Sequence, residues 1–94
     1  MTDPTDPVQI TLLIKDDCGF CDHAKQVLRR LGDTYPLRVT EMDLATHEGR
    51  QLAATAGVLF APGVLVDGRA FSYGRLSERK LRRTLDKRLP QHSA

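Results

Sequence analysis

The two cysteines of the chain lie only three residues apart, as Cys18-Gly19-Phe20-Cys21, and this spacing constrains the fold more than any other feature. A disulfide between them closes no long loop, so it cannot replace a hydrophobic core as the several disulfides of small secreted proteins do. The 94 residues must therefore build one ordinary core, because the chain is too short for two. In a reducing compartment, such a cysteine pair is more often catalytic or metal-binding than structural.

The composition is that of an ordinary globular domain. Hydrophobic residues make up 40% of the chain, and 14 Lys plus Arg nearly balance 12 Asp plus Glu. No stretch approaches the roughly 18 apolar residues of a membrane-spanning helix, and residues 1–7 do not have the pattern of a secretion signal. We therefore expect a cytoplasmic protein with no membrane partner, in which short tails over residues 1–7 and 90–94 flank one domain over residues 8–89.

The hydrophobic pattern of the first half of the chain predicts a strand, a helix and a second strand. Val8 to Ile14 is β-branched and aliphatic on both faces, as in a central strand covered by helices on both sides. Apolar residues at three- and four-residue spacing predict a helix over residues 19–31, and Gly32 is the expected stop. Apolar and polar residues alternate over residues 36–44, which predicts a strand with one face less buried than the other.

The second half predicts a helix, a hairpin and a final helix. In order, these are a helix capped by Thr46 and ended by Gly57, strands over residues 64–66 and 69–73, and a helix from Ser77 to Leu89. Asp67-Gly68 between the two strands is typical of a type I′ turn. The order β-α-β-α-β-β-α begins with a parallel βαβ unit, so we expect an α/β protein with helices on both faces of one four-stranded mixed sheet.

This element order resembles that of the thioredoxin superfamily, and more closely that of its small glutaredoxin-like members. The resemblance rests on the Cys18-Gly19-Phe20-Cys21 motif at the start of a helix, on Lys15 before it and on Pro62 just before the hairpin. It covers residues 8–89 and implies the thioredoxin fold, a four-stranded mixed sheet flanked by three helices. It also implies a thiol-disulfide oxidoreductase with a redox-active Cys18–Cys21 disulfide, no metal and no bound cofactor.

The two cysteines are expected to have different roles. Cys18 lies at a helix start, where backbone N–H groups and the helix dipole favour a negative charge, so it is the expected nucleophile. Cys21, one turn later, is placed to resolve the mixed disulfide. Asp16 and Asp17 oppose the Cys18 thiolate, so we expect a reductant rather than a strong oxidant.

The resemblance also implies where a substrate binds. In relatives the proline equivalent to Pro62 is cis, and the backbone of the preceding residue, here Ala61, pairs with the substrate chain. Phe20 and Phe60 are expected to flank this groove, although a core position is equally plausible for Phe60. Lys15 and Arg75 are candidates to meet the carboxylates of a small thiol. The expected partners are a protein disulfide or a small-thiol disulfide as substrate, and a reductase or thiol pool as electron donor.

Two further features of the sequence bear on metal binding and on partners. His23, His47 and His92 supply no second paired motif, so we expect no zinc site within a monomer. Residues 75–89 carry a net charge of +5, which leaves −3 for the rest of the chain. This helix has no interleaved aromatic residues, so we expect a solvated face or a contact with an acidic protein rather than with nucleic acid. The alternative function is a non-enzymatic redox sensor, a metal- or cluster-binding protein, or a partner-binding module that uses this basic helix.

Overall fold

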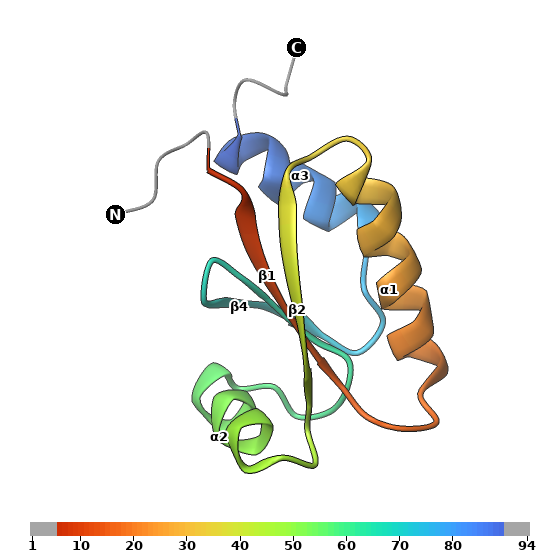
Figure 1. The fold of residues 1–94 in the computed structure, drawn as a ribbon, viewed down its shortest axis with the longest axis vertical. Helices are drawn as coiled ribbons and strands as arrows, with labels where there is room; N and C mark the ends of the chain where they lie inside the picture. The colour runs from red at the N-terminus through yellow and green to blue at the C-terminus, as the bar shows by residue number, and fades with distance from the viewer. Residues whose placement is uncertain (1–5, 90–94) are drawn as a thin grey trace.

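The computed structural model describes residues 6–89, and every predicted element is present in the predicted order (Figure 1). The elements are β1 (Val8–Ile14), α1 (Gly19–Gly32), β2 (Leu37–Asp43), α2 (His47–Ala56), β3 (Gly63–Val66), β4 (Arg69–Tyr73) and α3 (Glu78–Arg88). The predicted tails fall on residues 1–5 and 90–94, outside the described residues, and on residues 6 and 7, which precede β1. Within residues 6–89, no helix is long and apolar enough to cross a membrane.

The four strands form one mixed sheet in the order β2-β1-β3-β4. β1 pairs in parallel with β2 and antiparallel with β3, and β3 forms an antiparallel hairpin with β4. A parallel pair needs a crossover connection, and α1 provides it between β1 and β2. The predicted α/β class and four-stranded mixed sheet are thus confirmed.

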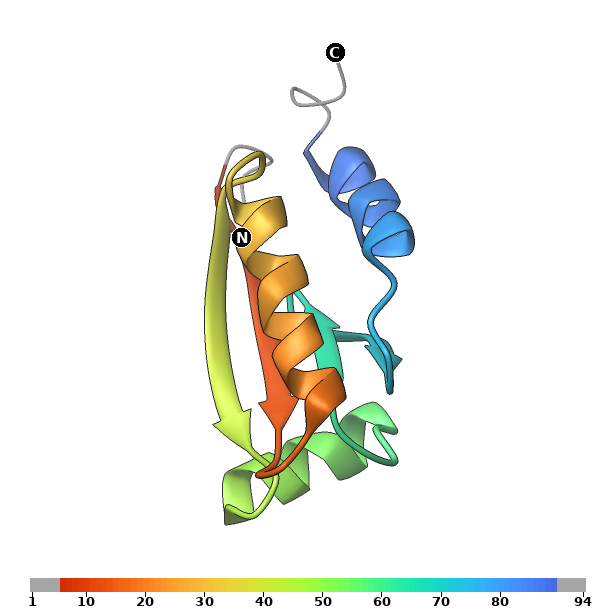
Figure 2. The same ribbon diagram turned by 90° about the vertical axis from the view of Figure 1, so that its right-hand side faces the viewer.

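Helices cover the two faces of the sheet unequally (Figure 2). α1 and α3 lie side by side on one face, over a large core cluster that includes Ile10, Leu12, Leu31, Leu81 and Leu85. α2 lies at the foot of the molecule and covers a smaller cluster on the other face, made of Leu13, Ala53, Val58 and Leu65. The prediction that both faces of β1 are covered holds only at its carboxyl end, because α2 is short and leaves Gln9 exposed.

The predicted helix caps are confirmed, with one exception. The side-chain oxygens of Thr46 and Ser77 accept backbone N–H hydrogen bonds at the starts of α2 and α3, and Gly57 ends α2 in the left-handed conformation (φ 74°). The prediction that Gly32 stops α1 is wrong by one residue, since Gly32 is still helical and Asp33 is the C-cap. The last turn tightens instead, and the Asp33 N–H donates to the Arg30 carbonyl oxygen at 3.2 Å.

The β3–β4 hairpin has the predicted turn. Asp67 and Gly68 both have positive φ, 50° and 82°, as a type I′ turn requires. A register shift between Val64 and Leu65 adds a bulge that the sequence did not predict.

Polar contacts fasten α3 to the rest of the fold. The Tyr35 hydroxyl donates to the Asp86 carboxylate, which raises the pKa of Tyr35. Arg30 of α1 donates to Glu78 at 2.8 Å, and this hydrogen bond lowers the pKa of the Glu78 carboxyl. α3 is therefore held at both ends, and its N-terminus is fixed beside α1.

Candidate functional site

Several chain segments meet at the edge of the sheet formed by the carboxyl end of β1. Ile14 pairs with Asp43 at the end of β2, Leu13 pairs with Gly63 at the start of β3, and Gly63 pairs with Tyr73 at the end of β4. The β1–α1 connection and the loop before β3 therefore begin next to each other, and both ribbon views show them side by side at the foot of the molecule (Figures 1 and 2).

The cysteine pair lies where the β1–α1 connection becomes α1. Asp17 takes the left-handed conformation (φ 51°), and Cys18, which follows, is the N-cap of α1. The Cys18 sulfur accepts the Cys21 backbone N–H at 3.1 Å, and the two residues form a disulfide with Cα atoms 5.1 Å apart. An anion at this sulfur would be stabilised by that N–H and by the helix dipole.

The two sulfur-bearing residues differ in their access to solvent. Cys18 is half-buried, whereas Cys21 faces the interior with only 2% of its surface exposed. A substrate from solution can therefore approach Cys18 much more readily than Cys21. This asymmetry agrees with the two roles predicted from the sequence.

The loop before β3 has the backbone geometry that the resemblance implies. The Ala61–Pro62 peptide bond is cis, and both residues are buried. The Pro62 carbonyl accepts the Gly74 N–H at 2.8 Å, whereas the backbone groups of Ala61 have no hydrogen-bond partner within residues 6–89. The described fold thus leaves the backbone groups of Ala61 unpaired, as pairing with the main chain of another molecule would require.

Three large apolar side chains are exposed on the two segments that meet here, and we call them the apolar rim. They are Phe20, Leu59 and Phe60, with 54%, 76% and 56% of their surfaces exposed. Phe60 is held edge-on against Tyr73, with ring centres 5.0 Å apart. Glycine is needed at position 74, because φ is 81° and a Cβ would lie 3.0 Å from the Phe60 ring.

Three carboxylates next to the cysteines form what we call the acidic collar, made of Asp16, Asp17 and Asp22. All three are exposed, and within the described part of the chain none has an ion pair or hydrogen bond from its side chain. Lys15 is also exposed. Lys25 forms an ion pair with Glu41, with 3.7 Å between Nζ and Oε1. Negative charge near Cys18 is therefore only partly balanced.

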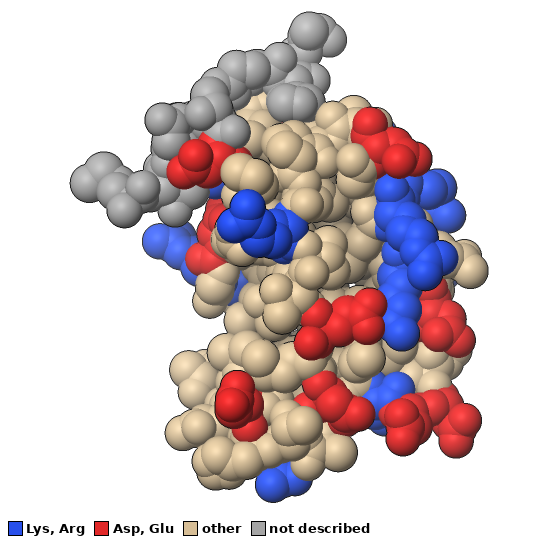
Figure 3. Space-filling model, in the orientation of Figure 1, with Lys and Arg blue, Asp and Glu red and all other residues tan. Residues whose placement is uncertain are grey.

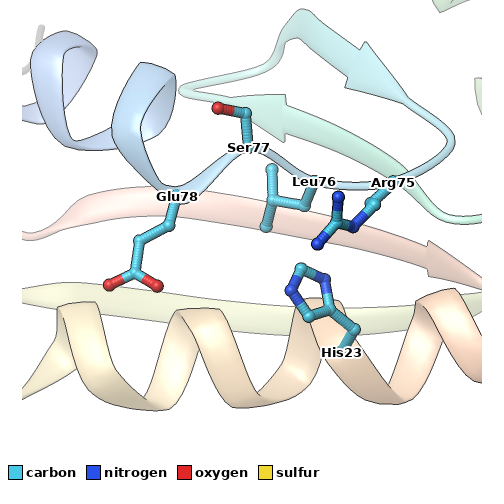
Figure 4. A pocket seen from close by; sticks show the side chains of 5 residues that line it. All are labelled: His23, Arg75, Leu76, Ser77 and Glu78. Atoms are coloured by element: carbon cyan, nitrogen blue, oxygen red, sulfur yellow. The ribbon is translucent and has the colours of Figure 1, made fainter.

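Arg75 lines a cavity that none of the other predicted binding residues lines. It is exposed and lines a cavity of about 380 Å³ with His23, Leu76, Ser77 and Glu78, between α1 and the β4–α3 connection (Figure 4). The close-up shows the Arg75 guanidinium directed toward the His23 imidazole. Lys15, Phe20, Ala61 and Pro62 do not line this cavity.

The sequence suggests His23 only as a possible metal ligand and does not reveal its position in this cavity. Its Nδ1 atom is buried and has no hydrogen-bond partner among the described residues. Nothing in the local sequence marks it, because the cavity exists only once the β4–α3 connection lies against α1. Across residues 6–89, no group of three or more His, Cys, Asp or Glu side chains could hold a metal ion.

Comparison with known proteins assigns the family. The family described as Glutaredoxin-like domain (DUF836) matches residues 9–86, most of the chain. The chain belongs to this glutaredoxin-like family. No curated protein matches it significantly.

Solved structures show the fold of this glutaredoxin-like domain. A mutant thioredoxin from Halobacterium salinarum NRC-1 superposes with a TM-score of 0.69 and 23% identity, over 89% of this chain and 76% of that one. A mutant of the thioredoxin-like protein BC3987 superposes with a TM-score of 0.67 and 23% identity, over 81% of this chain and 97% of that one. The unmutated BC3987 protein superposes with a TM-score of 0.65 and 22% identity, over 79% of this chain and 96% of that one. The predicted thioredoxin fold is confirmed, and a glutaredoxin-like domain with a Cys18–Cys21 pair indicates a redox function.

Proposed function

We propose that the protein is a dithiol thiol-disulfide oxidoreductase that reduces disulfides of proteins or of low-molecular-weight thiols. The observation that carries this proposal is the asymmetric cysteine pair, in which Cys18 is accessible at a helix N-cap and Cys21 is buried one turn later. A nucleophile must be exposed and favoured as a thiolate, and a resolving cysteine must be close but shielded from other substrates.

The reaction begins with the reduced protein. The Cys18 thiolate attacks one sulfur of the substrate disulfide, a mixed disulfide forms, and the departing substrate thiolate takes a proton from water. The Cys21 thiol then loses its proton and attacks the Cys18 sulfur, which releases the second substrate thiolate and closes the Cys18–Cys21 disulfide. The second substrate thiolate also takes a proton from water, so two electrons have passed from the cysteines to the substrate and both of its new protons come from water.

Among residues 6–89 no charged residue is buried as a whole, so we propose that the proton of Cys21 leaves to water rather than to an internal base. A reductase or a thiol pool then restores the dithiol, and no bound cofactor takes part. A reductant of this kind works in a reducing compartment such as the cytoplasm.

The binding residues follow from the same geometry. The backbone of Ala61, next to Pro62, pairs with an extended segment of the substrate, and Phe20 contacts a side chain beside the disulfide. Lys15 and Arg75 are proposed to meet carboxylates, Arg75 from the cavity that it shares with His23.

Two serine variants test the proposal. With a disulfide-bonded protein and a small disulfide as substrates, Cys18→Ser should reduce both at the background rate, because the attacking sulfur is gone. Cys21→Ser should still attack but accumulate a mixed disulfide on Cys18, which mass spectrometry without reductant detects. Equal activity of the wild type and Cys18→Ser, or no activity of the wild type with several electron donors, would contradict the proposal and favour the non-enzymatic alternative.

A further inference from the structure

The surface around Cys18 combines exposed apolar groups with unbalanced negative charge. Each of the three side chains of the apolar rim exposes more than half of its surface. A cluster of this kind beside a reactive group marks a surface that binds another molecule. The rim comes from both α1 and the loop before β3, two segments that meet at the carboxyl end of β1.

The main chain beside the rim favours a polypeptide ligand. The Ala61 N–H and C=O groups lack partners within residues 6–89 and follow the exposed Leu59 and Phe60 in the same loop. An extended peptide could pair with these groups while its side chains contact the rim.

The charge around Cys18 selects among such ligands. Asp16 and Asp17 directly precede Cys18 and Asp22 follows within the first turn of α1, so the collar lies within about one Debye length of the sulfur. Lys15 offsets only one of these three charges. Figure 3 shows that Asp and Glu side chains prevail at the foot of the molecule on this face, below most of its Lys and Arg.

We propose, building on the oxidoreductase function above, that the preferred substrate is a protein whose disulfide is flanked by Lys or Arg and by an apolar side chain. The apolar side chain packs on the rim, and the acidic collar, whose three charges outnumber that of Lys15, favours basic flanks over acidic ones. Asp16, Asp17 and Asp22 are thus determinants of specificity that act through charge, separate from the sulfur chemistry of Cys18.

The test measures single turnovers of the fully reduced protein, so no electron donor is needed. Three disulfide-bonded peptides share one core sequence with an apolar residue, and differ only in flanks of Lys, Gln or Glu. At low ionic strength, the Lys peptide should be reduced at least about tenfold faster than the Glu peptide, since electrostatic attraction accelerates encounter by this order. The ratio should shrink as salt is added.

Two collar variants and a control variant show whether the collar causes the difference in rate. Asp16→Asn should lower the Lys-to-Glu rate ratio several-fold, and Asp16→Asn with Asp17→Asn should bring it close to one. Asn tolerates the positive φ of position 17. Asp33→Asn removes the same charge at the opposite end of α1, about 20 Å away along the helix, and should leave the ratio unchanged.

The outcomes separate this inference from the proposed function. The Gln peptide reports any change in the reactivity of Cys18 itself, and the ratio of the two charged peptides cancels that change. If the Gln peptide is reduced but the ratio is near one or below, the charge selection is wrong and the oxidoreductase function stands. If none of the three peptides is reduced, both proposals fail.

Discussion

At the scale of single residues, the environment of Cys18 determines what kind of redox agent the protein can be. The N-cap position and the N–H of Cys21 favour the thiolate, whereas Asp16 and Asp17 oppose it. Strong oxidants of this fold owe their high potentials to a stabilised reduced form. The carboxylates limit that stabilisation here, which favours a reductant.

This balance predicts the reduction potential. We expect the Cys18–Cys21 couple of the wild type at about −200 to −270 mV, and we expect Asp16→Asn with Asp17→Asn to raise it by about 10 to 30 mV, because the thiolate becomes more stable. Equilibration in thiol redox buffers measures both values. A wild-type potential above about −150 mV, or a shift of the same size in Asp33→Asn, would show that the collar does not control the couple.

The positions that the sequence could predict are those that local structure determines. Cys18 lies at the helix start that the hydrophobic pattern predicts, and the cis bond before Pro62 follows from the family resemblance. The cavity that joins Arg75 and His23 could not be predicted, because its two sides are far apart in sequence and meet only through packing. The exposure of Phe60 was also open, since a phenylalanine is as often part of the core.

At the scale of elements, α3 depends on contacts outside its own apolar stripe. Its leucines are buried in the large core cluster, and its polar side chains bind α1 and the residues before β2. Tyr35, which is 4% exposed, joins both kinds of contact, because its ring is part of the core and its hydroxyl bonds to Asp86.

Tyr35→Phe should isolate the polar part of that contact. We expect it to lower the free energy of unfolding by about 1.5 to 3 kcal/mol at neutral pH, the usual net value of a hydrogen bond to a charged group. The pKa of Tyr35 is raised in the folded state by its bond to Asp86, so this stabilisation is complete below the ordinary value of 10.0 and is lost as pH rises through the higher folded value. Urea unfolding of the wild type and the variant, from about pH 7 to above about pH 10, measures this difference in stability. Equal stability of the two proteins at pH 7 would contradict the prediction.

Element positions were predictable because caps, turns and hydrophobic periods are local signals. Thr46, Ser77 and Asp67-Gly68 each satisfy backbone geometry within a few residues. The extent to which α2 covers β1 was not predictable, because aliphatic residues on both faces of a strand do not reveal how long the covering helix is. The bulge in β4, where Phe71 is the extra residue, likewise depends on its pairing with β3.

At the scale of the whole molecule, the sheet ends in two edge strands, β2 and β4. β2 exposes Val39, but the charged side chains of Arg38 and Glu41 on the same strand are also exposed. Charged residues on an edge strand hinder pairing with another sheet. We therefore propose that the protein is a monomer.

Light scattering after size-exclusion chromatography tests this expectation. The mass should be near 10.5 kDa and should not change with protein concentration. A mass near twice that value, which falls to the monomer value when Val39→Lys adds a further charge to the edge, would instead assign the exposed strand β2 to a dimer interface.

The exposed side chains of the apolar rim also bear on how relatives of this protein can diverge. Leu59 and Phe60 belong to neither core cluster, so exchanging them costs the fold little. Gly74 is constrained by its conformation and by the Phe60 ring, and Cys21 by burial. The sequence should therefore change quickly at the rim and slowly at Gly74 and Cys21. Duplicated copies could then acquire different substrates while they keep the same cysteine chemistry.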